Sequence, residues 1–263
     1  RTLTEYLGPR LFEPLGIGAA AWIHDRAGRE LGFSGLHATT DAIARLGLLY
    51  LRGGVWEGER LLPEWWVAEA TRAQIANEGG PESGWPDWQQ GYGFQFWMAR
   101  HGYRGDGAYG QFCVVLPEQD AVLAITSDTE DMQKVVDLVW EHLLPAFGPG
   151  PLSGREAADA ALADRLTRLA LPPAEGKAVA DGKTVAAEST TVFAPATGTC
   201  VDQPTLTAVE VGPGSRVTLV DDGERLELGP GLGADGWTVV DEPVPVAVSG
   251  GWSDAETLVV DVA

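Results

Sequence analysis

The sequence predicts an α+β fold: an antiparallel sheet flanked by helices over residues 1–148, followed by a smaller β-rich domain, barrel- or sandwich-like, over residues 149–263. Three observations predict it. Three strand signals between residues 91 and 127 follow one another with short connections, which favours antiparallel pairing over crossover helices. A helical stripe of apolar residues comes next. The Pro- and Gly-rich segment 145–154 then separates this part from a further run of strands.

The composition is that of an ordinary globular protein with an acidic excess. Of the 263 residues, 44% are hydrophobic and 21% are charged, so the chain can bury a sizeable core. The net charge of −20 argues against binding to a nucleic-acid backbone, which requires basic patches. No run of about 18 apolar residues occurs, so no membrane segment is expected. Neither nucleic acid nor a membrane is therefore an expected partner. No compartment is assigned, although the cytoplasm is slightly favoured.

The cysteines and histidines give no metal or disulfide pattern. Cys113 and Cys200 lie far apart, with neither disulfide-framework nor zinc spacing. The four histidines are scattered and lack the H-E-x-x-H spacing of zinc proteases. We therefore expect two unpaired, largely buried thiols, no metal and no organic cofactor.

Both ends of the chain fall within predicted secondary structure. Residues 3–11 begin an amphipathic helix pattern without a preceding Met, and the closing TLVVDVA is a β-branched run with no polar tail. We therefore expect a fragment of a longer protein, with the β-rich domain truncated at its C-terminus.

The first half of the chain alternates short strands with helices. A hairpin is expected over residues 18–37, with DRAG as its turn. Thr39 or Thr40 caps a helix that ends at Gly53-Gly54. Residues 63–74 place Pro at a first helical position.

A polar loop rich in Gly, Pro and Trp spans residues 77–90, and we place it beside a cleft. The predicted strands that follow are 91–100, 111–117 and 121–127. The next helix begins at Asp128 or Thr129 and would lie against one face of the sheet.

The second half of the chain contains one helix and several strands. The helix spans roughly 155–171, with an apolar stripe of leucines. Asp222-Gly223 is the turn of a hairpin, and three further strand signals follow it.

Residues 105–110 read GDGAYG, which matches the pattern G-x-G-x-x-G. A dinucleotide-binding turn needs a helix directly after the glycines, because the helix N-terminus holds the pyrophosphate. Here residues 111–117 form a predicted strand, so that interpretation fails. Two alternatives stay open: the glycines permit a tight turn or bulge, or they let a substrate approach the backbone of an exposed strand.

Four segments in order resemble the C-terminal half of the serine β-lactamase superfamily, on the branch of class C β-lactamases, D-aminopeptidases, esterases and 6-aminohexanoate-oligomer hydrolases. They are LFEPLGI (11–17), GLHATTDAIARLGLLYLRGG (35–54), RLLPEWW (60–66) and YGQFCVVLPEQDAVLAITS (109–127). The resemblance implies a hydrolase that forms an acyl-enzyme with a small-molecule ester, amide or peptide-like substrate. The YGQF form of the strand favours esterase or amidase activity over β-lactamase activity.

The resemblance also implies site residues. The family's third motif, K-T-G or H-x-G, falls on Gly105, Asp106 and Gly107, although neither Lys nor His leads it here. These residues would line the substrate, and the Ala108 amide would donate to the oxyanion.

Three neighbouring side chains are candidates for substrate contact. Tyr109 follows directly, and His101 either reaches the cleft or is an ordinary surface histidine. Trp88 clusters with Trp85 and Trp97, as a cleft wall or as packing.

The nucleophile of that family is absent from the chain. No serine has a Lys three residues later, and no tyrosine has an Asn two residues later, so S-x-x-K and Y-x-N are missing. No serine has the G-x-S-x-G setting either. We expect the catalytic Ser, Lys and Tyr upstream of Arg1, on a portion that this chain needs as its partner, and residues 1–263 alone to be inactive. The alternatives are a catalytically inactive binding protein on the same scaffold and a ligand-binding β-rich domain.

Overall fold

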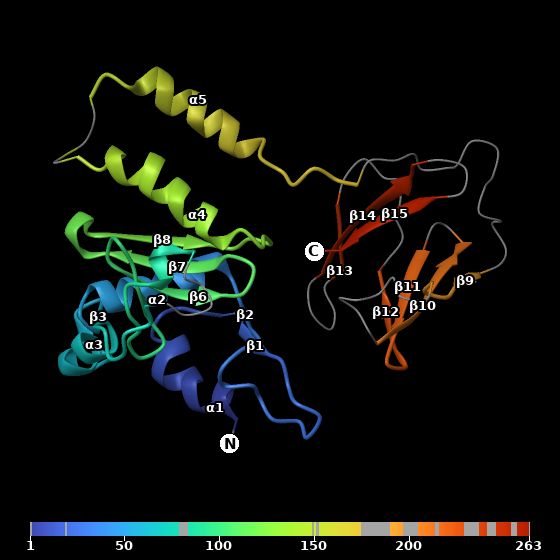
Figure 1. Cartoon of the computed structure of the whole chain (residues 1–263), viewed down its shortest axis with the longest axis horizontal. Helices are drawn as coiled ribbons and strands as arrows, with labels where there is room; N and C mark the ends of the chain where they lie inside the picture. Colours follow the sequence, from blue (N-terminus) through green and yellow to red (C-terminus); the bar gives the residue numbers. More distant parts are fainter. Residues whose placement is uncertain are drawn as a thin grey trace. The chain divides into compact units, whose positions relative to one another are not determined.

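The computed structural model describes residues 2–18, 20–78, 84–148, 150, 153–174, 190–196, 205–213, 216–228, 237–240, 246–253 and 257–262. The chain divides into two compact units, Arg1–Leu152 and Ser153–Ala263, each of which is described by itself (Figure 1). Among the described residues, no helix is long and apolar enough to cross a membrane. The structure is a mixed α/β one with several antiparallel sheets.

A four-stranded antiparallel sheet forms the centre of the first unit, with its strands in the order β5-β6-β7-β8. Its strands are β5 (Trp97–Met98), β6 (Tyr103–Gly107), β7 (Gln111–Leu116) and β8 (Ala121–Ile125). The short connections predicted for β7 and β8 are confirmed: the single 3₁₀ turn Pro117–Gln119 joins them.

Alternation along β7 divides the core between the two faces of the sheet. Phe112, Val114 and Leu116 pack on one face against Val136 of helix α4 (Met132–Leu138). On the opposite face, the odd-numbered β7 residues pack against helix α2 (Thr40–Leu51), as the layers in Figure 1 show. The sheet is thus covered by one helix on each side.

The caps of α2 and α4 explain where these helices begin. The Thr39 side chain accepts a hydrogen bond from the Ala42 amide at 3.2 Å, which confirms a threonine cap for α2 and selects Thr39. The prediction that the later helix begins at Asp128 or Thr129 is wrong by a few residues. Asp131 caps α4 instead, because its carboxylate accepts from the Lys134 amide at 3.1 Å.

Other elements of the first unit surround this three-layer core. A hairpin of β1 and β2 occurs where residues 18–37 predict it. Pro63 is the cap of α3 and does not lie inside it, so its predicted place at the first helical position is off by one residue. These elements are α1 (Leu3–Leu7), η1 (Gly8–Phe12), β1 (Ala20–Trp22), β2 (Leu36–Ala38), β3 (Val55–Trp56), β4 (Glu59–Arg60), α3 (Glu64–Ala70), η2 (Pro86–Trp88), η4 (Val139–Leu143) and η5 (Leu144–Ala146).

The strand predicted over residues 91–100 is mostly wrong, since only Trp97–Met98 pair as β5. The alternating pattern suggested a strand, but the chain bends at Gly91 and Gln95, both of which have positive φ. A Cβ on Gly93 would lie 2.2 Å from the Ala70 carbonyl oxygen, so the backbone packs against α3 at this point. Close approach to a neighbouring segment therefore overrides the local strand pattern.

The second unit consists of helix α5 (Glu156–Thr167) and two antiparallel sheets. Valines and leucines of both sheets share one core around Val211, Val217 and Val248, and the described strands form no closed barrel. Asp222 and Gly223 both have positive φ, which confirms the predicted hairpin turn. The strands are β9 (Thr191–Phe193), β10 (Leu206–Gly212), β11 (Arg216–Asp221), β12 (Glu224–Glu227), β13 (Thr238–Val240), β14 (Val246–Trp252) and β15 (Leu258–Val262).

Cys113 is expected to resist alkylation in the folded protein. Its side chain lies on the α2 face of the sheet with 8% exposure, and burial raises the pKa of the thiol to about 12. Because the thiolate is the nucleophile, iodoacetamide at pH 8 should modify the Cys113 peptide only after unfolding in urea. Peptide mapping by mass spectrometry measures this, and equal labelling with and without urea would contradict the buried placement. Cys200 lies outside the described residues.

Candidate functional site

The GDGAYG segment is the end of one strand and the turn to the next. Gly105–Gly107 are the last residues of β6, and Gly107 pairs with Gln111 at the start of β7. Residues 108–110 therefore form a three-residue hairpin turn, in which Tyr109 and Gly110 have φ of 61° and 86°. The strand predicted after the glycines is confirmed as β7, so a strand and not a helix N-terminus follows the turn.

Side chains from beyond β8 and from β7 hold this turn. The Ser127 hydroxyl lies 2.7 Å from the Gly110 carbonyl oxygen and 3.1 Å from that of Tyr109. The Gln111 side-chain amide donates a hydrogen bond to the Ser127 carbonyl oxygen and accepts one from the Ser127 backbone amide. The Thr129 amide also donates to the Tyr109 carbonyl, at 3.0 Å. The positive φ of Tyr109 is thus stabilised by its surroundings, as is usual for a functional or tightly packed turn.

The C-terminal half of β6 is an open edge of the sheet. The neighbouring strand β5 reaches only Tyr103 and Arg104 of β6. Within the described residues, no strand pairs with Gly105–Gly107 on that side, and all three are partly exposed. Main-chain groups at such an edge can pair with an extended peptide or a substrate amide.

The Asp106 side chain does not face this edge. It lies with Arg104 on the α4 face of the sheet, because residues two apart on a strand share a face. The Asp106 carboxylate is 6% exposed and forms an ion pair with Arg104, with Oδ1 and Nε 2.9 Å apart. Of Asp106, which the resemblance places among the residues that line the substrate, only the backbone therefore belongs to the edge. Burial raises the pKa of Asp106 to about 7, although the charge of Arg104 opposes that shift.

Trp88 lies in the core and does not line a cleft. Its side chain is 4% exposed and packs against Phe112 at a ring distance of 6.3 Å. The Arg104 guanidinium lies 4.1 Å from the centre of the Trp88 ring. The predicted cluster with Trp85 and Trp97 is confirmed. For Trp88, however, packing is the correct interpretation of the two that the sequence left open.

His101 and the turn residues lie at opposite ends of β6. His101 is in the turn between β5 and β6, where its ring stacks edge-on against Trp140 at 5.0 Å. A five-residue strand separates it from Ala108 by roughly 17 Å. The structure therefore does not bring His101 to the edge, and the alternative of a surface histidine is correct. Ala108 and Tyr109 are both exposed at the tip, with 56% exposure for Tyr109.

A buried charge network next to β6 has no counterpart in the sequence predictions. The carboxylate of Asp87 has 0% exposure and accepts hydrogen bonds from Arg100, from Gln133 and from the Trp140 indole. Burial alone would raise the pKa of Asp87, but these hydrogen bonds together hold it below its usual value. Arg100 also bonds Asp137. The side chains that bond the Asp87 carboxylate lie 13 to 53 positions from it, so no local spacing could have revealed these contacts.

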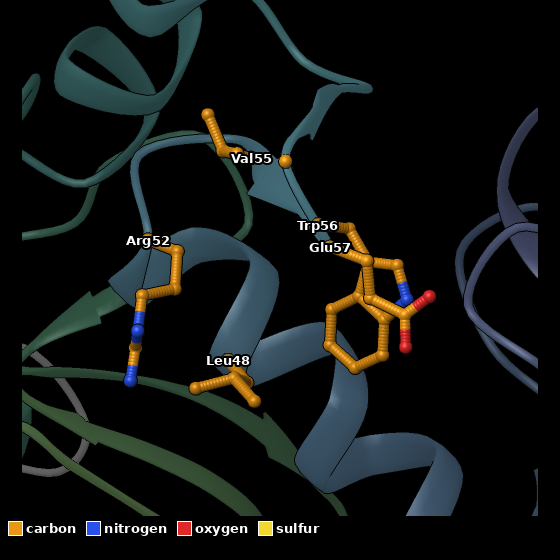
Figure 2. A pocket seen from close by; sticks show the side chains of 6 residues that line it. Leu48, Arg52, Val55, Trp56 and Glu57 are labelled. Carbon is orange, nitrogen blue, oxygen red and sulfur yellow. The ribbon is translucent and has the colours of Figure 1, made fainter.

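A cavity in the first unit lies at the other end of the sheet. It has a volume of about 560 Å³, and Figure 2 shows Leu48 of α2, Arg52 at the C-cap of that helix and Trp56 of β3 around it. Arg52 pairs with Asp120 in the β7–β8 connection at 3.9 Å, which places the C-terminal end of α2 there. The hydroxyls of Thr40 and Thr126 are 3.0 Å apart, so the N-terminal end of α2 lies at the other end of β8. The cavity is thus remote from the Gly105–Gly107 edge.

The described residues contain no group of three or more His, Cys, Asp or Glu side chains that could hold a metal ion.

No protein-family model and no curated protein matches the chain. Twenty-eight chains of solved structures match it. One is described as "Putative 6-aminohexanoate-dimer hydrolase from Bacillus anthracis", with 22% identity and a TM-score of 0.44. The match covers 53% of this chain and 37% of that chain, so this chain spans little more than a third of that structure's length. At this identity and TM-score the likeness carries no functional argument, and the function has to be argued from the site.

Proposed function

We propose that the chain is the C-terminal portion of a β-lactamase-like serine hydrolase that acts on an ester, amide or peptide-like substrate through an acyl-enzyme. The observation that carries the proposal is the open edge at Gly105–Gly107, followed by a turn that its neighbours hold in place. This edge falls where the four segments that resemble the family predict the substrate-facing strand.

The backbone of the edge and the turn would do the binding. Main-chain groups of Gly105–Gly107 pair with an extended substrate, and the missing side chains of the two glycines leave room for it. Within the described residues, the Ala108 amide has no hydrogen-bond acceptor, so it is available to donate to the oxyanion of a tetrahedral intermediate.

The covalent steps need residues that the chain does not contain. In the proposed reaction a serine hydroxyl attacks the carbonyl carbon while a lysine amine takes its proton. The intermediate then expels the alcohol or amine, and water hydrolyses the acyl-enzyme. Because residues 1–263 hold no S-x-x-K and no Y-x-N, we place the Ser, Lys and Tyr upstream of Arg1.

The charge of the edge favours ester or amide substrates over β-lactams. Neither Lys nor His leads the Gly105–Gly107 motif, and the nearby Arg104 guanidinium is fully buried on the opposite face. In the described part of the site, no cation is therefore offered to a substrate carboxylate at the edge.

Labelling and turnover test the proposal. Residues 1–263 alone should neither hydrolyse p-nitrophenyl acetate nor react with a fluorophosphonate probe. A longer product that includes an upstream S-x-x-K should do both, and replacing that serine with alanine should abolish both, because the serine is the nucleophile. Covalent labelling of residues 1–263, or no labelling of the longer product, contradicts the proposal.

A binding protein on the same scaffold is the second candidate. The missing lead Lys or His favours it, since the edge then offers backbone alone. In that case a longer product would bind a substrate-like ester or peptide in calorimetry without turning it over.

A further inference from the structure

Two charged side chains lie beneath the open edge, on the face of the sheet away from the glycines. The side chains of Arg104 and Asp106 are 0% and 6% exposed. Their two bonds are imperfect: Nη2 of Arg104 donates to Oδ2 at 3.2 Å, while Nε and Oδ1, 2.9 Å apart, are not aligned for a hydrogen bond. The ion pair therefore offsets only part of the cost of burying the carboxylate.

Arg104 joins the edge strand to two other segments. Its guanidinium donates to the carbonyls of Asp87 in η2 and Met98 in β5, at 3.0 and 3.3 Å. It also lies over the Trp88 ring. Asp106 is the partner that lies farther along β6, between the two glycines. On the side of β6 that β5 does not reach, the pair thus links the strand, which β7 pairs on its other side, to η2 and β5.

We propose that Asp106, packed against Arg104, is a positioning residue for the Gly105–Gly107 edge: while its side chain stays buried, the edge stays extended and its backbone can pair with a substrate. Substrate binding at the edge rests on the proposed function, whereas the effect of Asp106 on the conformation of the edge does not. The Asp106 side chain does not touch the substrate and acts through the strand that carries it.

The protonation state of the Asp106 carboxyl group affects the free energy of opening the edge. The groups that face it are Arg104 on its own strand, Asp87 in η2 and Tyr92 in the segment before β5. Its pKa is raised to about 7 by burial, whereas an opened edge would return it to the ordinary value near 3.8. Opening then releases a proton, so it becomes more favourable as the pH rises from about 4 to 7.

Amide hydrogen exchange of residues 1–263 tests this without requiring hydrolysis. After correction for intrinsic exchange rates, the opening equilibrium constant of residues 103–111 should be roughly 30-fold larger at pH 8 than at pH 5.5. Asp106→Asn removes the titration and should abolish this difference, while thermal melting confirms that the variant is folded. Glu210→Gln, which removes the partly exposed carboxylate paired with Arg225 in the second unit, should leave the difference intact.

Each outcome decides the inference. A wild-type edge that opens equally at both pH values overturns it, and so does an Asp106→Asn variant that keeps the wild-type difference. In the longer product, kcat should fall above pH 7 in the wild type and not in Asp106→Asn. If exchange behaves as expected and no hydrolysis is found, the proposed function fails while the positioning stands. If hydrolysis is found and exchange is flat, the positioning alone fails.

Discussion

Asp87→Ala is expected to lower the free energy of unfolding of the first unit by about 3–5 kcal/mol, because it leaves buried donors without an acceptor. The Asp87 carboxylate has 0% exposure and accepts from Arg100, Gln133 and Trp140. Removing it leaves the Trp140 indole N–H without its acceptor and takes from Arg100 one of its two carboxylate partners, the other being Asp137. Urea denaturation followed by tryptophan fluorescence measures the loss.

The control for this change is Asp41→Ala. Asp41 forms an exposed pair with Arg45 one turn along α2, so its removal should cost less than about 1 kcal/mol. The pH gives a second check, since hydrogen bonds hold the folded-state pKa of Asp87 below 3.8. Its stabilising contribution is therefore present above that value and lost as the pH falls below it. If the two variants lose the same free energy of unfolding, the buried network stabilises the unit no more than the exposed Asp41–Arg45 pair does.

Gly110→Ala should destabilise the hairpin turn of the candidate site by about 2–4 kcal/mol, from strain at positive φ together with lost hydrogen bonds. Gly110 has a φ of 86°, and a Cβ at this position would lie 2.3 Å from the Ser127 hydroxyl oxygen. That hydroxyl would have to leave the carbonyls of Tyr109 and Gly110, which releases the turn. Thermal melting and hydrogen exchange of residues 103–111 measure the two effects.

Gly28→Ala is the matched control for Gly110→Ala. Gly28 has a similar φ of 75°, but nothing lies within 4 Å of a Cβ there. Its replacement should therefore cost only the backbone strain, about 1–2 kcal/mol. If both alanine variants lose the same stability, the contact with Ser127 is not what holds the turn.

Much of the fold followed from local chemistry that the sequence displays directly. The Thr39 cap and the glycines after α2 mark a helix, and Asp222-Gly223 marks a hairpin, because backbone conformation at these positions depends on one or two residues. The strand after GDGAYG was visible as a β-branched run, which was enough to exclude a dinucleotide site. The resemblance to a family predicted that Gly105–Gly107 face a substrate, but it did not predict that β5 leaves them unpaired on one side.

Side-chain environments could not be predicted in the same way. Asp106 and Trp88 were expected at a substrate surface, yet both are buried, and His101 lies at the far end of the strand. The face of a strand that is buried depends on which elements pack against it. For β6 these are α4, about 30 residues later in the chain, and η2, about 20 residues earlier.

By itself, the sequence therefore determined the strands β7 and β8, the helices before and after them, and the lack of S-x-x-K and Y-x-N motifs within residues 1–263, whereas it missed β6. Only the tertiary structure decided that Gly105–Gly107 form an unpaired edge and that Asp87, Arg104 and Asp106 are buried beside it. The physical reason is the sequence separation of the interacting residues. Periodicity and turn preferences depend on neighbours in the chain, whereas burial and ion pairing depend on segments that only folding brings together.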